Sequence, residues 1–348
     1  MSEFAQQLIC WHKLHGRHGL PWQGSRDPYA VWLSEIMLQQ TQVSSVIPYY
    51  LRFLGRFPDI ATLAAADQDE VLAHWSGLGY YSRARNLHRA AQIMAETHAA
   101  EFPREFEQIL GLPGIGRSTA SAIGAFSFGT RRAILDGNVK RVLARYLAVA
   151  GYPGEKKVAD LLWRHAEDLL PETEIETYTQ ALMDLGATVC TRGKPNCGAC
   201  PVSADCVAHQ QGHQTEFPQP RPRKAQPEKA TTMLLFMHQG EIFLEKRPPA
   251  GIWGGLWSFP EIAVSEDARQ HAETCFGFES DQAEARPPMK HVFTHFRLNI
   301  KPLLINIRKI QPMARQQEGI WLTIEDAMEG AIPTPVRKLL AGLRKPPA

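Results

Sequence analysis

Apolar residues recur three and four positions apart along the first two hundred residues, which is the period of one face of an α-helix. Polar caps mark helix starts: Ser2 precedes the first apolar run, and Asp27 precedes Pro28, a residue favoured at the first helical position. Strand-like alternation does not interrupt this pattern. It therefore predicts an all-α domain over residues 1–207.

The pattern stops at residues 208–229, which are polar and proline-rich and predict an extended linker. Beyond the linker, TTMLLFMHQGEIFLEKRP predicts a β-hairpin and HVFTHFRLNIKPLLINI predicts further strands. Helical patterns follow near residues 266–276 and 335–343. We therefore predict a multidomain protein with a small α+β domain over residues 230–348.

Composition narrows the class of protein only a little. A chain of 348 residues is long enough for two cores, and its formal net charge of +2 does not by itself indicate a nucleic-acid partner. Apolar runs are too short to span a bilayer, and the first residues lack a signal-peptide core. We expect a cytoplasmic protein that has no membrane partner.

A glycine-rich turn, LPGIG at residues 112–116, separates two helical patterns at about residues 105–127. Glycine permits positive φ and leaves no side chain between the backbone and a ligand. Main-chain N–H groups at the start of the helix from Arg117 would favour an anion such as phosphate. An ordinary tight connection between helices is the alternative interpretation.

One acid stands alone in the stretch that follows this turn. Between Arg117 and Arg145 there are six basic residues and a single carboxylate, Asp136, which opens a third helix. We interpret the cations as phosphate-seeking and the isolated acid as a residue with a reserved role.

Glu35 is the second acid of interest. Its neighbours three and four positions away include Val31, Trp32 and Leu38, so it projects from a largely apolar helix face. Such a carboxyl group is either a partnered structural acid or a group whose pKa is raised by desolvation, which would make it a proton donor near neutral pH.

Four of the six cysteines are grouped in a polar loop. Their spacing is C-x6-C-x2-C-x5-C, and in a reducing compartment this grouping indicates metal ligands before disulfides. Zinc is the general expectation for four thiolates, although cysteine ligation also suits iron–sulfur clusters. The grouped residues are Cys190, Cys197, Cys200 and Cys206. Cys10 and Cys275 stand apart, and we expect them to be core thiols.

In their order along the chain, SEIMLQQTQV, GLGYYSRARNL, LPGIGRSTA, ILDGNVKRV and the cysteine loop resemble the MutY family of adenine DNA glycosylases. This family belongs to the iron–sulfur branch of the helix-hairpin-helix DNA glycosylase superfamily. The resemblance covers nearly the whole chain and implies a Nudix-like C-terminal domain. It also implies a 4Fe-4S cluster at residues 190–206, with zinc as the alternative.

The resemblance implies excision of adenine paired with 8-oxoguanine or guanine in double-stranded DNA, by a monomer associated with the bacterial nucleoid. Glu35 would protonate the leaving base, Asp136 would stabilise the sugar cation, and Asn138 would bind near the sugar and the acid. The residues implied to contact DNA or the lesion are Gln42, Tyr80, Leu112, Gly114, Gly116, Arg117, Ser118, Gln180, Phe293, Thr294 and His295.

Two departures from related patterns refine this expectation. Ser118 stands where strand-cutting relatives carry a lysine nucleophile, so we expect a monofunctional enzyme that leaves an abasic site. Gln270 and Thr274 replace glutamates of the Nudix metal site, so we expect lesion recognition rather than nucleotide hydrolysis. A glycosylase acting on oxidised pyrimidines and a non-enzymatic iron–sulfur DNA-binding protein are the alternatives.

Overall fold

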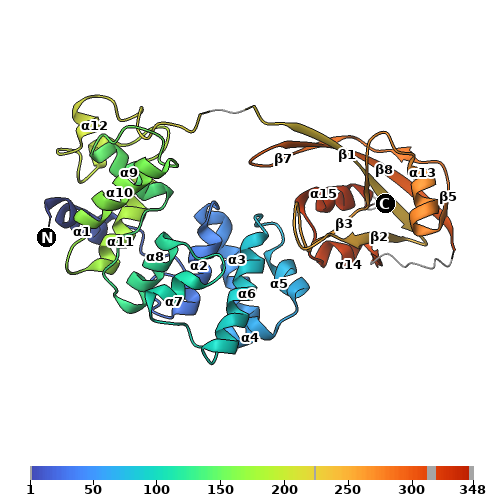
Figure 1. Ribbon diagram of the computed structural model, residues 1–348, viewed down its shortest axis with the longest axis horizontal. Helices are drawn as coiled ribbons and strands as arrows, with labels where there is room; N and C mark the ends of the chain where they lie inside the picture. The colour runs from blue at the N-terminus through green and yellow to red at the C-terminus, as the bar shows by residue number, and fades with distance from the viewer. Residues whose placement is uncertain (1, 223–224, 312–318, 345–348) are drawn as a thin grey trace. The chain divides into compact units, whose positions relative to one another are not determined.

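The computed structural model describes residues 2–222, 225–311 and 319–344. Its contacts divide the chain into two compact units. The helical unit comprises Met1–Ala65 and Asn86–Arg223, and the sheet unit comprises Ala66–Arg85 and Lys224–Ala348 (Figure 1). Residues 1, 223–224, 312–318 and 345–348, which the expected domains and linker include, lie outside the described part of the chain.

Helices build the first two hundred residues, as the period of the apolar positions predicts, and the all-α prediction is confirmed (Figure 1). They are α1 (Glu3–His15), α2 (Pro28–Leu38), α3 (Val43–Arg56), α4 (Ile60–Ala65), α5 (Gln68–Trp75), α6 (Ser82–Thr97), α7 (Phe106–Gly111), α8 (Arg117–Phe128), α9 (Gly137–Tyr146), α10 (Lys156–Asp168), α11 (Ile175–Asp184) and α12 (Val207–Gln210). A π-helical turn, η1 (Leu185–Val189), continues α11, and a short 3-10 turn, η2 (Cys197–Ala199), lies in the cysteine loop.

The expected helix starts are present. The Ser2 hydroxyl accepts a hydrogen bond from Ala5 N, and the Asp27 carboxylate accepts one from Tyr29 N at 3.1 Å, with Pro28 at the first position of α2. Most of α2 is apolar and buried, so this helix runs through the interior of the helical unit. Glu35 is therefore carried by a helix whose position is fixed by packing.

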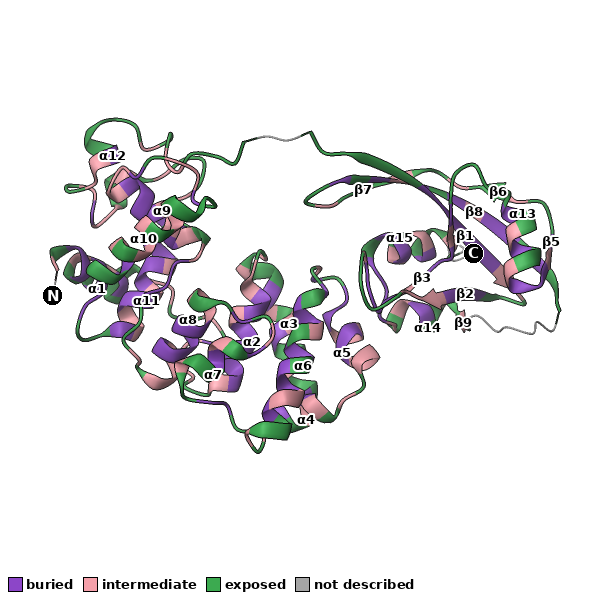
Figure 2. Ribbon diagram, in the orientation of Figure 1, coloured by how far each residue is buried: buried purple, intermediate pink, exposed green. Residues whose placement is uncertain are grey.

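One large apolar core in the helical unit packs α1 against helices that come much later in the sequence (Figure 2). It takes side chains from α1, α8, α9, α10, α11 and η1, including Leu8, Val139, Leu162 and Tyr178. Burial of a large apolar side chain contributes about 1.5–3 kcal/mol. Because α9 and α11 both pack into this core, it fixes the start of α9, where Asp136 lies, relative to α11.

The sheet unit contains a mixed sheet and several short helices (Figure 1). Its strands are β1 (Glu228–His238), β2 (Glu241–Lys246), β3 (Trp257–Ser258), β4 (Glu261–Ile262), β5 (Phe278–Ser280), β6 (Glu284–Ala285), β7 (Met289–Val292), β8 (Arg297–Ile310) and β9 (Gly319–Thr323). The helical turns are α13 (Ala268–His271), η3 (Ala272–Phe276), α14 (Ile324–Glu329) and α15 (Thr334–Leu343).

The predicted hairpin is formed by β1 and β2, and the α+β prediction for this part of the chain is confirmed. Gln239 and Gly240, at its turn, have φ values of 50° and 90°, which suit the twist of a two-residue hairpin. The long strands β1 and β8 pair in parallel at the centre of the sheet. Strand β7 pairs with β8, and the loop between them carries Phe293, Thr294 and His295.

A segment from the helical part of the sequence belongs to the sheet unit. The Asp69 carboxylate on α5 accepts hydrogen bonds from Lys246 Nζ at 2.8 Å and from Trp257 Nε1 at 3.2 Å. Ser76, just after α5, donates its hydroxyl to the Ile332 carbonyl at 3.0 Å. These contacts attach residues 66–85 to the sheet.

The expectation for Cys10 is wrong. This thiol is exposed, because the buried face of α1 is formed by Leu8, Ile9 and His12 and position 10 projects away from it. Cys275 is partly buried on η3. Across the described ranges, no helix combines the length and the apolar character needed to cross a bilayer.

Candidate functional site

Glu35 lines a cavity of about 390 Å³ inside the helical unit, which we call the Glu35 cavity. Its wall combines apolar groups with two side-chain amides, a guanidinium and other charged or polar groups. The lining residues used below are His12, Arg17, Trp22, Gln23, Glu35 and Gln180. Gln180, an expected base contact, is thus brought to the same cavity as Glu35.

The Glu35 carboxyl group holds its proton to unusually high pH. Burial raises the pKa of Glu35 to about 8, and the negative charge of Asp136 contributes to the rise. The two carboxyl groups are therefore close enough to interact electrostatically. Near neutral pH, Glu35 is available as a proton donor.

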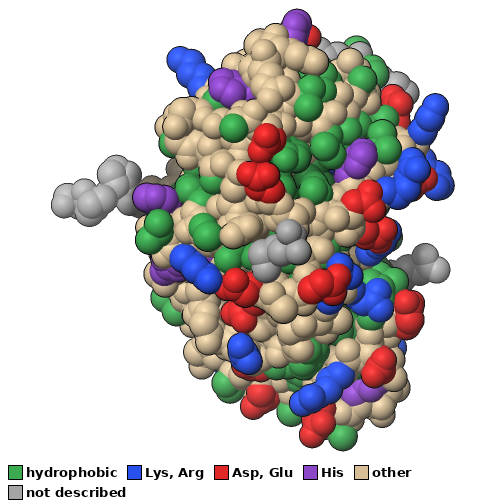
Figure 3. Space-filling view, turned by 90° about the vertical axis from the view of Figure 1, so that its left-hand side faces the viewer, with side chains coloured by type: hydrophobic (Ala, Val, Ile, Leu, Met, Phe, Trp, Pro, Cys, Tyr) green, Lys and Arg blue, Asp and Glu red, His purple; other side chains and the backbone are tan. Residues whose placement is uncertain are grey.

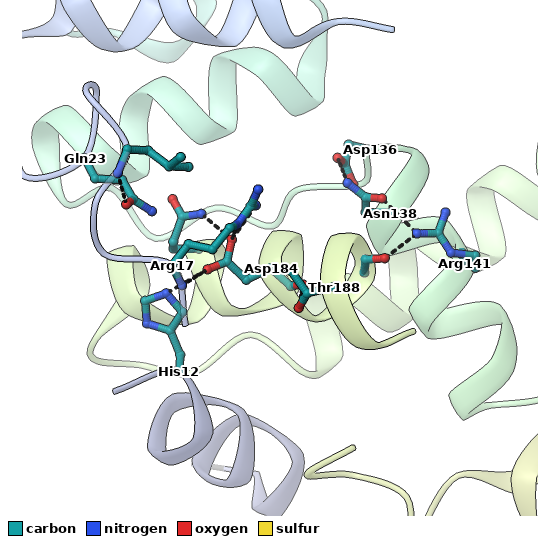
Figure 4. Close-up of polar contacts among 11 residues, drawn as sticks. His12, Arg17, Gln23, Asp136, Asn138, Arg141, Asp184 and Thr188 are labelled. Atoms are coloured by element: carbon teal, nitrogen blue, oxygen red, sulfur yellow. Dashed lines mark hydrogen bonds and ion pairs between the residues drawn. The ribbon is translucent and has the colours of Figure 1, made fainter. Parts of the chain in front are cut away.

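Asp136 occupies the N-cap position of α9. Its Oδ1 accepts a hydrogen bond from Val139 N at 2.8 Å. Its Oδ2 accepts one from Asn138 Nδ2 at 3.4 Å, as Figure 4 shows. Burial raises the pKa of Asp136, whereas these bonds and the positive charge of Arg141 favour the ionised form. Asp136 is not among the residues that line the Glu35 cavity.

Arg141 connects the neighbour of Asp136 to the cysteine loop. Its Nη2 donates to Asn138 Oδ1 at 2.9 Å (Figure 4) and to the Gly186 carbonyl at 2.6 Å. Its Nε donates to the Cys190 carbonyl at 2.7 Å. Residue 186 must be glycine, since a Cβ there would lie 2.5 Å from Asn138 Cβ. The position of Asn138 is thus fixed from two sides.

A buried acid that the sequence reasoning missed supports the wall of the Glu35 cavity. Asp184 is fully buried and accepts hydrogen bonds from Arg17 N and Nε, both at 2.8 Å, and from Gln180 Nε2 at 2.9 Å. His12 Nε2 lies 3.3 Å from the same carboxylate (Figure 4). Burial acts to raise the pKa of Asp184, but the bonds from His12 and Arg17 outweigh it, so the pKa is lowered.

Asp184 orients both Arg17 and Gln180 through these bonds. The sequence did contain a signal for it, because an acid four residues after Gln180 interrupts the apolar positions of a helix, as Glu35 does.

The glycine-rich turn between α7 and α8 has an open backbone. Gly114 has a φ of 81°, whereas Gly116 adopts an ordinary negative φ as the N-cap of α8 and leaves that helix without a side-chain cap. The Leu112 side chain is buried, so only its main chain can reach a ligand. Arg117 stacks over Trp163, with 3.9 Å from its Cζ to the ring centre, and pairs with Glu167.

Three of the six basic residues between positions 117 and 145, namely Arg131, Arg141 and Arg145, bind carbonyl groups of the chain, which their interpretation as phosphate-seeking cations did not include. Arg131 donates to the carbonyls of Leu170 and Pro171, both at 3.0 Å. Arg145 is buried and donates to several carbonyls, including that of Thr191 at 2.8 Å. A run of arginines in a sequence does not reveal that carbonyl groups elsewhere in the chain satisfy them.

Ser118, the residue that replaces a lysine of strand-cutting relatives, binds the backbone beside Asp136. Its Oγ accepts a hydrogen bond from Leu135 N at 3.0 Å. The hydroxyl therefore ties the start of α8 to the segment that leads into α9.

The four grouped cysteines line one small cavity, together with apolar side chains that include Val142, Leu185 and Val202. Arg145 Nη1 donates to Cys190 Sγ at 3.3 Å. Burial raises the pKa of the Cys200 thiol to about 11 and also raises the pKa of the Cys197 and Cys206 thiols. Within the described part of the chain, no three His, Cys, Asp or Glu groups are already spaced as a single-ion site.

This donor set fits a thiolate-ligated group, since four sulfurs face one apolar space with a cationic donor beside them. The arrangement of the four cysteines is compatible with an iron–sulfur cluster and with zinc.

A pocket of about 580 Å³ lies within the sheet unit, and we call it the Phe293 pocket. It brings together four of the expected lesion contacts, namely Tyr80, Phe293, Thr294 and His295. Tyr80 is 43% exposed and adopts a left-handed φ of 49°. Gln42 is exposed at the N-cap of α3 and does not line this pocket.

Surface charge does not single out a binding face in the view that is drawn. Acidic and basic side chains are interspersed on the face shown in Figure 3, in line with the small net charge of +2.

Two family models match the chain. One describes the HhH-GPD superfamily base excision DNA repair protein and matches residues 33–168. The other describes a NUDIX domain and matches residues 231–342. The helical part and the sheet part of the chain are thus each matched by a separate model.

An adenine DNA glycosylase of Buchnera aphidicola subsp. Acyrthosiphon pisum is 37% identical to this chain, and the match covers 98% of each. The structure of a thermostable thymine-DNA glycosylase is similar with a TM-score of 0.55 and 28% identity, over 60% of this chain and 95% of the other. An endonuclease III in a non-covalent DNA complex shares the fold, with a TM-score of 0.51 and 19% identity over 60% and 94% of the two chains.

The buried Asp184 network makes a prediction about stability. Replacing Asp184 by Asn should lower the free energy of unfolding by about 3 kcal/mol, because Arg17 would lose its buried counter-charge. Urea denaturation followed by circular dichroism measures this change. Asp160→Asn is the matched control: it removes an exposed partner of Lys156 and should cost under about 1 kcal/mol. Equal losses in the two variants would show that the network contributes no special stability.

Proposed function

Since the chain belongs to the adenine DNA glycosylase family, we propose that it hydrolyses the N-glycosidic bond of adenine paired with 8-oxoguanine or guanine in double-stranded DNA. It is a DNA glycosylase of base excision repair. The observation that carries the finer proposal is the electrostatic coupling of Glu35, whose pKa is raised to about 8, with Asp136 at the start of α9.

Glu35 is the general acid in this proposal. Adenine leaves poorly as an anion, so a ring nitrogen must be protonated while the bond to the sugar breaks. A carboxyl group that keeps its proton near neutral pH meets this requirement, and the Glu35 cavity has the amides of Gln23 and Gln180 to bind the polar edge of the base. The base must leave the duplex stack to reach such a cavity.

Asp136 is the charge-stabilising group. The N–H groups at the start of α9, the Asn138 amide and the charge of Arg141 all favour its carboxylate form. With one carboxyl group protonated and the other ionised, the pair can donate a proton to the base and stabilise the cationic sugar that remains. Asn138, held by Arg141 and Gly186, positions the carboxylate.

We propose that the enzyme is monofunctional, and the absence of a lysine at position 118 supports this. A strand-cutting enzyme uses an amine to attack the sugar and form a Schiff base. Ser118 has no amine, and its hydroxyl is bound to the backbone before Asp136. Water then completes the reaction, and the product is an abasic site.

The main-chain N–H groups at the start of α8, which has no side-chain cap, are proposed to bind the DNA backbone. The Phe293 pocket is proposed to read the base opposite adenine. Its aromatic residues offer a stacking surface, and Thr294 offers a hydroxyl on an exposed loop. The remaining proposed contacts are Gln42 and Tyr80.

We propose that Cys190, Cys197, Cys200 and Cys206 hold a 4Fe-4S cluster, with zinc as the alternative. When bound, such a group would cross-link the loop between η1 and α12 through four thiolates. Arg141 and Arg145 both donate to the Cys190 carbonyl, so they support the loop from the α9 side.

The first test offers the full chain a choice of substrates. Duplexes with adenine opposite 8-oxoguanine should be cleaved only after alkaline treatment, because the enzyme leaves an intact abasic strand. Asp136→Asn should lower the excision rate by about 10³-fold without loss of DNA binding. Excision of thymine glycol instead would indicate a pyrimidine glycosylase, and binding without any excision would indicate a non-enzymatic protein.

The second test follows the pH dependence of excision. The active form carries a protonated Glu35, so the single-turnover rate should fall above about pH 8, by about tenfold for each further pH unit. The pKa is raised, and the loss therefore occurs as pH rises. Glu35→Gln should abolish most of the activity, and the activity that remains should no longer fall above about pH 8. A flat rate from pH 7 to 9.5 would exclude Glu35 as the proton donor.

The third test identifies the group held by the cysteines. Purified protein should show a broad absorption band in the blue part of the visible spectrum and should contain iron and sulfide. Cys200→Ala should lose this band, whereas Cys10→Ala, at the exposed cysteine on α1, should keep it. A colourless protein that contains zinc would support the alternative metal.

A further inference from the structure

The Phe293 pocket contains two residues to which no role has been given so far. Arg85 and Trp253 line it together with Tyr80, Phe293 and Thr294. Arg85 comes from the start of α6, and Trp253 comes from the loop that joins β2 to β3. Both belong to the sheet unit.

Arg85 anchors the β2–β3 loop. Its Nη1 donates a hydrogen bond to the Gly254 carbonyl at 2.6 Å. The guanidinium is partly buried, and a charged donor makes a stronger bond to a carbonyl than a neutral one does. Because Gly254 follows Trp253 directly, this bond fixes the backbone next to the indole ring.

The anchored loop is tightly folded and strained. A Cβ on Gly254 would lie 2.5 Å from the Pro249 carbonyl oxygen, so only glycine fits there. Trp253 adopts a left-handed φ of 56°, which is unfavourable for a residue with a side chain. Such a conformation persists only where neighbouring contacts hold it.

Trp253 in turn supports the loop between β7 and β8. Trp253 is 8% exposed, and its ring lies 5.5 Å from the Phe293 ring and 5.7 Å from the His291 ring, measured between centroids. Phe293 also stacks on Phe296 at 4.5 Å, and Phe293 N donates to the Phe296 carbonyl. The exposed Thr294 follows Phe293 directly.

A continuous series of contacts therefore runs from Arg85 through the Gly254 carbonyl, the Trp253 ring and the Phe293 ring to the residue before Thr294. We propose that Arg85 is a positioning residue for recognition of the base opposite adenine, acting through Trp253 on the loop that carries Thr294. This inference rests on the proposed mispair specificity and names the residues that set it.

A purely structural Arg85 would behave differently. Loss of a bond that only stabilises the sheet unit would lower the unfolding temperature and affect all substrates alike. Loss of a bond that sets the position of Thr294 lowers the preference between partner bases, because only one of them makes the contact that depends on this loop.

The test compares single-turnover excision of adenine opposite 8-oxoguanine with excision opposite guanine, using the full chain. Arg85→Gln should reduce the ratio of the two rates by about tenfold, the factor expected for a lost hydrogen bond to a charged group. Arg85→Lys should restore part of the ratio, since it keeps a cationic donor. Trp253→Ala should reproduce the loss, because it removes the ring between Gly254 and Phe293.

Arg89→Gln is the matched control, because Arg89 lies one turn further along α6 and is 56% exposed. It should leave the ratio unchanged. Thermal unfolding and binding of an undamaged duplex identify variants that fail to fold. An equal loss on both substrates, or an unchanged ratio in Arg85→Gln and Trp253→Ala, overturns the proposal. If the unmodified protein does not distinguish the two partners, the mispair assignment fails, and this proposal fails with it.

Discussion

Removing a carboxyl group from water disfavours its charge, and the helical unit uses this effect in two opposite ways. Glu35 receives no compensating donors from the contacts described above and keeps its proton, whereas Asp184 receives several donors and gives its proton up. Asp136 lies between these cases, since burial opposes its ionisation and the start of α9 supports it. The division of labour between the two proposed catalytic acids thus follows from how many donors face each of them.

Arg141 and Arg145 of α9 connect the surroundings of Asp136 to the cysteine loop. Arg141 reaches Asn138 on one side and the Cys190 carbonyl on the other, and Arg145 closes the same loop through carbonyls and a thiol. The π-helical turn η1 brings the Gly186 carbonyl into reach of Arg141. Through Arg141, the start of α9 and the cysteine loop are therefore held by one set of hydrogen bonds.

Sequence periodicity was sufficient to predict the helical and α+β parts, the caps at Ser2 and Asp27, and the hairpin at Gln239–Gly240. An acid on an apolar face also made Glu35 a candidate before any geometry was known. The partners of long side chains were not predictable. Arg131, Arg141 and Arg145 resemble free cations in the sequence, and only the folded chain supplies the carbonyl groups that bind them. The pairing of Arg85 with Gly254 spans 169 positions and leaves no periodic signal.

The attachment of α5 to the sheet bears on how the chain can be divided. Residues 66–85 contact the sheet through Asp69 and Ser76, although the chain before and after them belongs to the helical unit. A fragment that ends in the linker would keep α5 but lack Lys246, Trp257 and the Ile332 carbonyl. Cutting between the units therefore does not yield two self-sufficient pieces, and an expression boundary placed by sequence order alone exposes an interior surface.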